Sequence, residues 1–160
     1  EWGHNPLPQS NLPNTSSKEP ETVCYCGKTN CIETYLSGPA FIKHFHTAYP
    51  HLKTQIETAQ ALAEAACHQL TETKDYFELY CDRLARGLTQ VINTIDSDCI
   101  VLGGGLSNID ALYGQLPEKI ARYIFSDSVR TKIVKAHHGD SSGVRGAAWL
   151  GMRHGILEAC

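Results

Sequence analysis

Three closely spaced cysteines are the residues of this sequence with the clearest capacity for chemistry. They lie within the ten-residue stretch Cys24-Tyr25-Cys26-Gly27-Lys28-Thr29-Asn30-Cys31-Ile32-Glu33. Few upstream residues qualify as a fourth ligand, and the best of them is His4. Three thiolates and an imidazole suit tetrahedral zinc, and a set that fills all four coordination positions is typical of a structural site. The pattern predicts structural zinc held by His4, Cys24, Cys26 and Cys31.

The alternative is that the clustered cysteines form a disulfide beside a free thiol, or simply pack in a core. The chain has seven cysteines, and it shows neither a secretory signal nor a long apolar run. These features favour a reducing, cytoplasmic environment without a membrane, where neighbouring cysteines are more often metal ligands. Spacing alone does not assign His4, because the nineteen residues between it and Cys24 fit no standard zinc finger.

A glycine triplet is the second feature that suggests ligand binding. Gly103, Gly104 and Gly105 follow the short apolar run of residues 98–102, which predicts a buried parallel strand. A strand, a glycine turn and a helix in succession form the place where open α/β sheets bind ligands. The triplet is neither a Walker motif, since no Lys-Ser/Thr pair follows, nor a dinucleotide fingerprint, since Asn108 holds the last glycine position. A tight turn that serves packing is the alternative interpretation.

The elements that must position these residues follow from hydrophobic periodicity. Residues 5–23 contain four prolines, so they are predicted to form an irregular, partly mobile surface excursion. A second strand is predicted at residues 131–136. Ser107 and Asp110 resemble a helix-capping pair. The predicted helices span residues 36–49, 56–70, 108–125 and 144–157. One more helix is predicted to be capped by Thr71 or Thr73 and to end near residue 95. The histidines at positions 44, 46, 51 and 68 show no ligand spacing and are interpreted as surface or packing residues.

Composition limits the possible classes. The 160 residues are enough for one domain with a real core, and the 42% apolar and 19% charged content is ordinary for a globular protein. The net charge of −3 does not favour nucleic-acid binding through this segment. The chain opens without a methionine at Glu1-Trp2-Gly3-His4, so it is expected to be part of a longer protein.

The motifs together resemble those of the ROK family (repressors, open reading frames and sugar kinases). The resemblance rests on Glu1-Trp2-Gly3-His4, on the cysteine stretch, on Ile100-Val101-Leu102-Gly103-Gly104-Gly105-Leu106-Ser107 and on residues 138–148. It spans essentially the whole chain. It implies an α/β fold, namely the C-terminal lobe of an actin-like ATPase (ribonuclease H-like) sugar kinase. Residues 1–35 would form the zinc-binding loop and sugar-binding segment, and residues 36–160 the lobe that carries the nucleotide-side glycine loop.

The resemblance also implies roles for individual residues. Glu1, His4 and Glu33 would contact the sugar, and His4 would bind zinc together with the three cysteines. Gly103, Gly104 and Gly105 would face ATP. The family usually has glycine where this chain has Asn30, and asparagine can adopt the same left-handed conformation, so metal binding is expected to persist.

The implied activity is ATP-dependent phosphorylation of a hexose by the full-length protein. The phrase Glu1-Trp2-Gly3-His4-Asn5-Pro6-Leu7-Pro8 resembles the fructokinase (mannokinase) branch, which favours fructose and possibly mannose. An N-acetylglucosamine kinase or a sugar-responsive ROK repressor is the alternative. The family's phosphate-binding motif and catalytic aspartate are missing from residues 1–160, so this segment alone is expected to be inactive. Mg²⁺ would accompany ATP, and a homodimer is expected.

Overall fold

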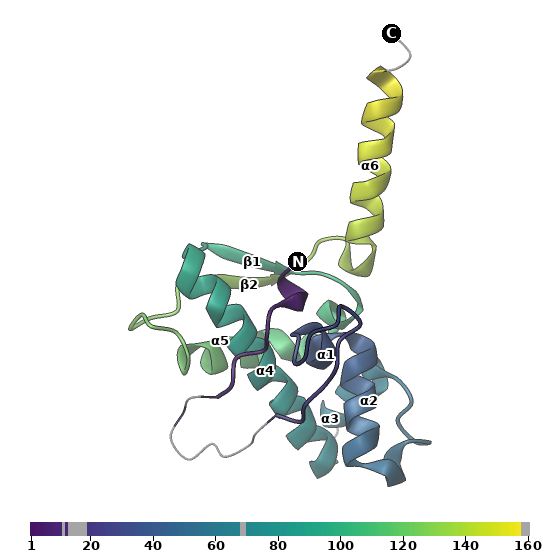
Figure 1. Cartoon of the computed structure of the whole chain (residues 1–160), viewed down its shortest axis with the longest axis vertical. Coiled ribbons are helices and arrows are strands. Elements are labelled where there is room, and N and C mark those ends of the chain that lie inside the picture. The colour runs from purple at the N-terminus through teal and green to yellow at the C-terminus, as the bar shows by residue number, and fades with distance from the viewer. Residues whose placement is uncertain (11, 13–18, 68–69, 158–160) are drawn as a thin grey trace.

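A computed structural model describes residues 1–10, 12, 19–67 and 70–157 (Figure 1). The described residues form a mixed α/β structure in which most of the mass is helical. Its helices are α1 (Glu33–Leu36), α2 (Gly38–Ala48), α3 (Ala59–Cys67), α4 (Thr71–Ile95), α5 (Ala111–Ala121) and α6 (Ser142–Leu157), and its strands are β1 (Cys99–Leu102) and β2 (Lys132–Lys135). Within this part of the chain, no helix is both long and apolar enough to cross a membrane.

The long helix α4 is the centre of the core, because its apolar side chains recur at helical spacing and face the neighbouring helices. Tyr76 and Tyr80 pack around Phe41 of α2, with ring centroids 5.6 and 4.5 Å away. Farther along α4, Leu84, Leu88 and Ile92 are buried. The helix predicted to be capped by Thr71 or Thr73 and to end near residue 95 is therefore confirmed; Thr71 is its first residue, and Leu70 stands at the N-cap position.

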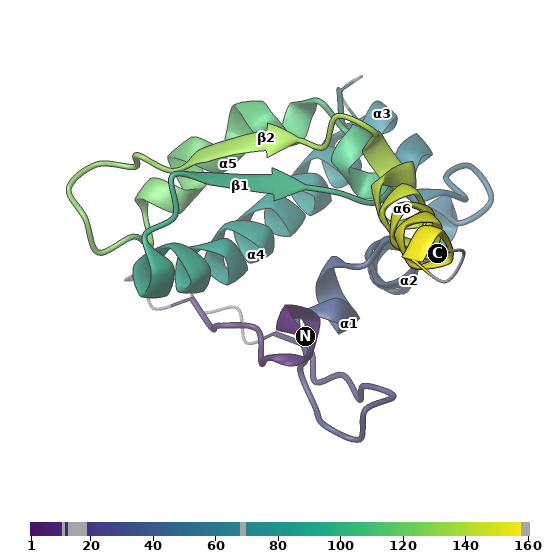
Figure 2. The same cartoon turned by 90° about the horizontal axis from the view of Figure 1, so that it is seen from above.

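Within the described residues the sheet has two strands, which pair in parallel with Ile100 opposite Ile133. Helices α4 and α5 lie on one side of it (Figure 2). Ile100 packs against the core, whereas Val101 on the other face is 60% exposed. The prediction of a parallel strand is confirmed. The prediction that the strand is buried is wrong for the described residues, because they cover only one of its two faces.

The helix predicted at residues 108–125 is shorter, and its predicted cap does not form. A 3-10 turn, Gly105–Asn108, precedes α5, and within it the Ser107 hydroxyl donates to the Gly104 carbonyl at 2.7 Å. Ser107 is thus occupied before the helix starts. Asp110 stands at the N-cap position but caps nothing with its side chain, and its Oδ1 accepts from Lys135 at 3.3 Å.

The predicted excursion at residues 5–23 is irregular where it is described, and residues 11 and 13–18 lie outside the described residues. Its end is not a surface feature, because the Glu19 side chain is only 9% exposed. Two of the predicted packing histidines, His44 and His46, hydrogen-bond backbone carbonyls through Nε2, and His68 lies outside the described residues.

Helix α6 projects away from the body of the structure (Figure 1). The prediction of a final helix over residues 144–157 is confirmed, with a start at Ser142. Val144 and Leu150 on this helix are 74% and 55% exposed.

Candidate functional site

The cysteine loop is folded by backbone hydrogen bonds and by two residues with positive φ. The Cys24 amide donates to the Lys28 carbonyl at 2.8 Å, and the Gly27 amide donates back to the Cys24 carbonyl at 3.0 Å. Gly27 has φ +84° and Asn30 has φ +59°, conformations that glycine and asparagine adopt with least strain. An isolated antiparallel bridge between Pro6 and Cys31 then holds the loop against the N-terminal segment.

The structure brings together all four of the predicted metal ligands. One donor atom from each of His4, Cys24, Cys26 and Cys31 lies within 4.8 Å of the others. Two of these separations, Cys24 Sγ to His4 Nδ1 and Cys26 Sγ to Cys31 Sγ, are 3.6 Å. A tetrahedral zinc ion with ligands at about 2.0–2.3 Å places its donor atoms about 3.3–3.8 Å apart. The cluster therefore has the donors and nearly the spacing that such an ion requires.

The thiols of this cluster differ in acidity. The backbone amide of Lys28 lowers the pKa of the Cys26 thiol to about 7, whereas burial raises that of Cys31 to about 11. Cys24 and Cys31 are buried and Cys26 is exposed. Metal binding requires thiolates, so a bound cation would supply the positive charge that keeps buried sulfurs deprotonated.

His4 joins the cysteine cluster to the predicted sugar-facing residues. Its Nδ1 faces Cys24, and its Nε2 points to the opposite side, 3.6 Å from Glu33 Oε2 and 3.8 Å from Glu1 Oε2. Glu33 opens helix α1 directly after the cysteine loop, while Glu1 precedes the 3-10 turn Trp2–His4. Two carboxylates and an imidazole edge thus converge on the solvent-facing side of the cluster. The Glu1 side chain is 94% exposed and that of Glu33 is 41% exposed.

Sequence reasoning missed Tyr25 as a member of this group. Its hydroxyl lies 2.9 Å from His4 Nε2, and the two rings meet edge to face with centroids 5.1 Å apart. Partial desolvation, followed by the charge of Glu33, raises the pKa of the Tyr25 phenol, although most of the side chain is exposed. Tyr25 lies between two cysteines in sequence, and this position was the only available signal that it belongs to the site.

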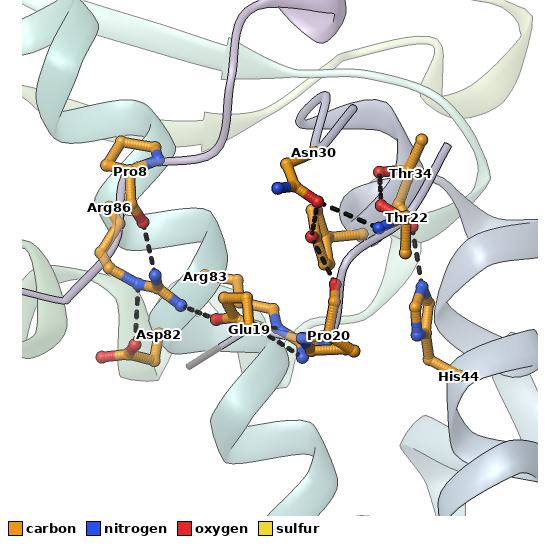
Figure 3. Close-up of polar contacts among 11 residues, drawn as sticks. Pro8, Glu19, Pro20, Thr22, Asn30, Thr34, His44, Asp82, Arg83 and Arg86 are labelled. Carbon is orange, nitrogen blue, oxygen red and sulfur yellow. Dashed lines mark hydrogen bonds and ion pairs between the residues drawn. The ribbon is translucent and has the colours of Figure 1, made fainter. Parts of the chain in front are cut away.

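Asn30 does more than supply a left-handed backbone. Its side-chain oxygen accepts from the Thr22 amide at 3.0 Å and from the Tyr35 hydroxyl at 2.8 Å (Figure 3). The Tyr35 hydroxyl proton also lies within 2.7 Å (oxygen to oxygen) of the Pro20 carbonyl, so the two acceptors share it. These contacts tie the cysteine loop to the segment before it and to α1. A glycine at position 30 would permit the same backbone but would lack the two contacts that the Asn30 side chain makes.

The glycine triplet lies on a different side of α1, at the carboxyl end of β1. Gly104 has φ +84°, and a Cβ built at Gly103, Gly104 or Gly105 would meet no described atom within 4 Å. Gly105 also lines a cavity of about 620 Å³ between α2, α3 and the start of α5. Its walls are largely apolar, and they include Pro39, Ala59, Ala63, Leu106 and Ile109.

Trp2 connects the two regions. All three glycines line a second cavity, of about 280 Å³, whose wall also contains Trp2. The indole packs against Gly87 of α4, where an added Cβ would lie only 2.9 Å from Trp2 Cζ2. Glycine inside a helix costs about 0.5–1 kcal/mol relative to alanine. At this position it allows the indole to approach the helix backbone.

The sequence matches the ROK family over residues 1–154. It is 34% identical over 153 residues to an N-acetyl-D-glucosamine kinase of Vibrio atlanticus, an alignment that covers 96% of this chain and 49% of that protein. The chain thus spans about half the length of the curated relatives it matches.

Two solved structures share the fold. A ROK family glucokinase from Streptomyces griseus, in complex with glucose and AMPPNP, superposes with a TM-score of 0.73 at 22% identity, over 94% of this chain and 50% of that one. A ROK family transcriptional regulator, a homologue of the Escherichia coli MLC protein, superposes with a TM-score of 0.64 at 20% identity, over 84% of this chain and 34% of that one. The predicted α/β fold of the actin-like ATPase type is thereby confirmed.

Proposed function

The chain belongs to the ROK family, and on that premise we propose that the full-length protein transfers a phosphoryl group from ATP to a hydroxyl of a hexose. The observation that carries the proposal is the convergence of Glu1, His4 and Glu33 beside the cysteine cluster. A hexose is a ring of hydroxyl groups, and carboxylates are strong acceptors for hydroxyl donors. These three residues form the proposed sugar-binding group.

Zinc is the proposed occupant of the cysteine cluster. The donor set of three sulfurs and one imidazole suits zinc and leaves no coordination position open for catalysis. When bound, the ion would supply structural restraint to the loop. His4 would bind it through Nδ1, which faces Cys24, and would turn Nε2 toward the sugar. Pre-positioned contacts of this kind lower the cost of ordering the site when the substrate binds.

The proposed nucleotide side is the glycine triplet with its adjoining cavity. The bare backbone of Gly103, Gly104 and Gly105 permits a ligand to approach closely, since no side chain stands in the way. The neighbouring cavity of about 620 Å³ is lined mainly by apolar groups, with Asn108, Asp110 and Thr58 among the polar ones. A flat, largely apolar base with a few hydrogen-bonding edges suits such walls. ATP, with Mg²⁺ on its phosphates, is the proposed ligand.

The hexose itself has three candidates. The N-terminal phrase of the sequence favours fructose or mannose, whereas the curated relative from Vibrio atlanticus is an N-acetyl-D-glucosamine kinase. The full-length protein should be assayed for ATP-dependent phosphorylation of fructose, mannose, glucose and N-acetylglucosamine under identical conditions. Turnover of one sugar well above the others would establish the kinase and name its substrate.

A sugar-responsive repressor is the second candidate, favoured by the shared fold with a ROK family transcriptional regulator. Sugar binding without turnover of any of the four hexoses would favour this candidate and contradict the kinase. Residues 1–160 carry a net charge of −3, so DNA contacts would have to come from elsewhere in the protein. Family membership also leads us to propose a homodimer, which sedimentation velocity would test.

A further inference from the structure

Glu19 is an acidic side chain held in the interior by two arginines from α4. Arg83 donates to Glu19 Oε2 from Nε at 3.0 Å and from Nη2 at 2.7 Å, and Arg86 Nη2 donates to Oε1 (Figure 3). The three side chains are 9%, 5% and 3% exposed. Burial opposes ionisation, yet the hydrogen bonds and charges of the arginines outweigh it and hold the pKa of the Glu19 carboxyl below its ordinary value.

Each arginine has further partners that fix its position. Arg86 donates from Nε to Asp82 Oδ2 at 3.1 Å and from Nη1 to the Pro8 carbonyl. Arg83 lies over the ring of Tyr35, 5.3 Å from its centroid. The arginines therefore contact the excursion at two points, the Pro8 carbonyl and the Glu19 carboxylate. Arg83 also packs against the ring of Tyr35.

The same Tyr35 continues the connection to the cysteine loop. Its hydroxyl has a single proton, which two acceptors share: the carbonyl of Pro20, the residue after Glu19, at 2.7 Å and the side-chain oxygen of Asn30, which precedes Cys31, at 2.8 Å. The Thr22 amide binds Asn30 as well. An unbroken series of short contacts thus runs from α4 through Glu19 to the loop that carries Cys24, Cys26 and Cys31. Contacts that surround a metal site typically hold its ligands in place.

We propose that Glu19 is a positioning residue, which with Arg83 and Arg86 clamps residues 19–22 so that Asn30 holds the cysteine loop in its metal-binding shape. The inference rests on the proposed zinc site and goes beyond it, because none of these residues belongs to the predicted ligand or sugar-binding sets. The clamp acts on the loop that carries the cysteine ligands, and only through that loop on Glu33.

The test compares zinc release in three variants of the full-length protein. Release to a chromophoric chelator should be about tenfold faster in Glu19→Gln, the range typical of lost outer contacts to a metal site. Asn30→Gly keeps the charges and the left-handed backbone but removes the side-chain amide. It should also make zinc release faster than in the wild type, by a smaller factor than Glu19→Gln. Glu21→Gln is the matched control, because Glu21 is two residues away and exposed. It should release zinc at the wild-type rate.

A role in stability alone gives a different pattern. In that case Glu19→Gln would lower the melting temperature, yet zinc release and the visible spectrum of the cobalt-substituted protein would match the wild type, and the proposal would be wrong. Should Glu19→Gln not fold, wild-type release by Asn30→Gly would overturn the proposal equally. A protein that takes up neither zinc nor cobalt would also overturn it. Absence of hexose phosphorylation would refute only the proposed activity, since zinc release is measured without a sugar.

Discussion

The cysteine loop and the glycine triplet are prepared for binding in opposite ways. Both need left-handed backbone, at Gly27 and Asn30 in one and at Gly104 in the other. The cysteine loop is braced on its inner side by side chains, from His4 through Asn30 to the buried Glu19 clamp. Around the glycine triplet an added Cβ would touch no described atom, and two cavities adjoin it.

The difference indicates how each region is expected to respond to mutation. A braced loop should lose metal and stability together when one contact is removed, because its contacts share the same few residues. An open backbone should tolerate small side chains in the free protein and reject them only when a ligand must come close. The following four predictions test this contrast, beginning with the largest effect.

Cys26→Ser should abolish metal binding. Replacing one thiolate of a four-ligand set removes the folding contribution of the metal along with its site. Zinc content should fall from one ion per chain to near zero, and the melting temperature should fall by on the order of 10 °C, given about 2–4 °C per kcal/mol in a chain of this size. Cys99→Ser is the control, because Cys99 is exposed on β1. Full metal content and unchanged melting in Cys26→Ser would refute the site.

Glu33→Gln in the full-length protein should weaken sugar binding and leave zinc in place. The change keeps the shape of the side chain and removes the charge that faces His4 Nε2 at 3.6 Å. We expect the KM for the hexose to rise about 10–100-fold, which corresponds to roughly 1.4–2.7 kcal/mol. Glu57→Gln, at an exposed position outside the site, is the control. Loss of zinc in Glu33→Gln would instead make this residue part of the metal's support.

Low pH should weaken the ion pairs of Glu19 with Arg83 and Arg86. Because the folded-state pKa of this carboxyl lies below its ordinary value of 4.5, its contribution is present above that value and is lost as the pH falls through the folded-state pKa. Urea unfolding at pH 7, 5, 4 and 3 should show wild type and Glu19→Gln converging at low pH. A constant difference at every pH would contradict the clamp.

Gly103→Ala should give the smallest change in stability, within about 0.5 kcal/mol of wild type, because space is open and the backbone is not left-handed. In the full-length protein the same variant should raise the KM for ATP several-fold, since a methyl group would stand where the nucleotide approaches. Gly114→Ala, a glycine of α5 that also faces open space, should leave this KM unchanged. An unchanged KM for ATP in Gly103→Ala would show that the glycine triplet does not take part in nucleotide binding.

The elements with strong local signals could be predicted from the sequence. The apolar stripe of α4, the parallel pairing of the two β-branched runs and the convergence of His4 with three cysteines all follow from residue type, spacing or resemblance. The Ser107 cap failed because a 3-10 turn engages the hydroxyl with a carbonyl three residues back. That competition between two local bonds cannot be decided from the motif alone.

The Glu19 clamp could not be predicted, and the reason is physical. Arg83 and Arg86 are three residues apart on α4, a spacing that is equally typical of a solvated helix face. Their burial depends on a proline-rich segment that lies more than sixty residues earlier in the sequence. Nothing local marks Glu19 as a buried acid, because its partners are assembled only by the tertiary fold.

X-ray absorption at the zinc edge of the purified protein tests the central claim most directly. We expect a first shell of three sulfur atoms at about 2.3 Å and one nitrogen at about 2.0–2.1 Å, from Cys24, Cys26, Cys31 and His4. A shell of four sulfurs, a shell that includes oxygen, or the absence of zinc would contradict it. A shell of four sulfurs would detach His4 from the metal, and with it the link between the cysteine loop and the proposed sugar-binding group.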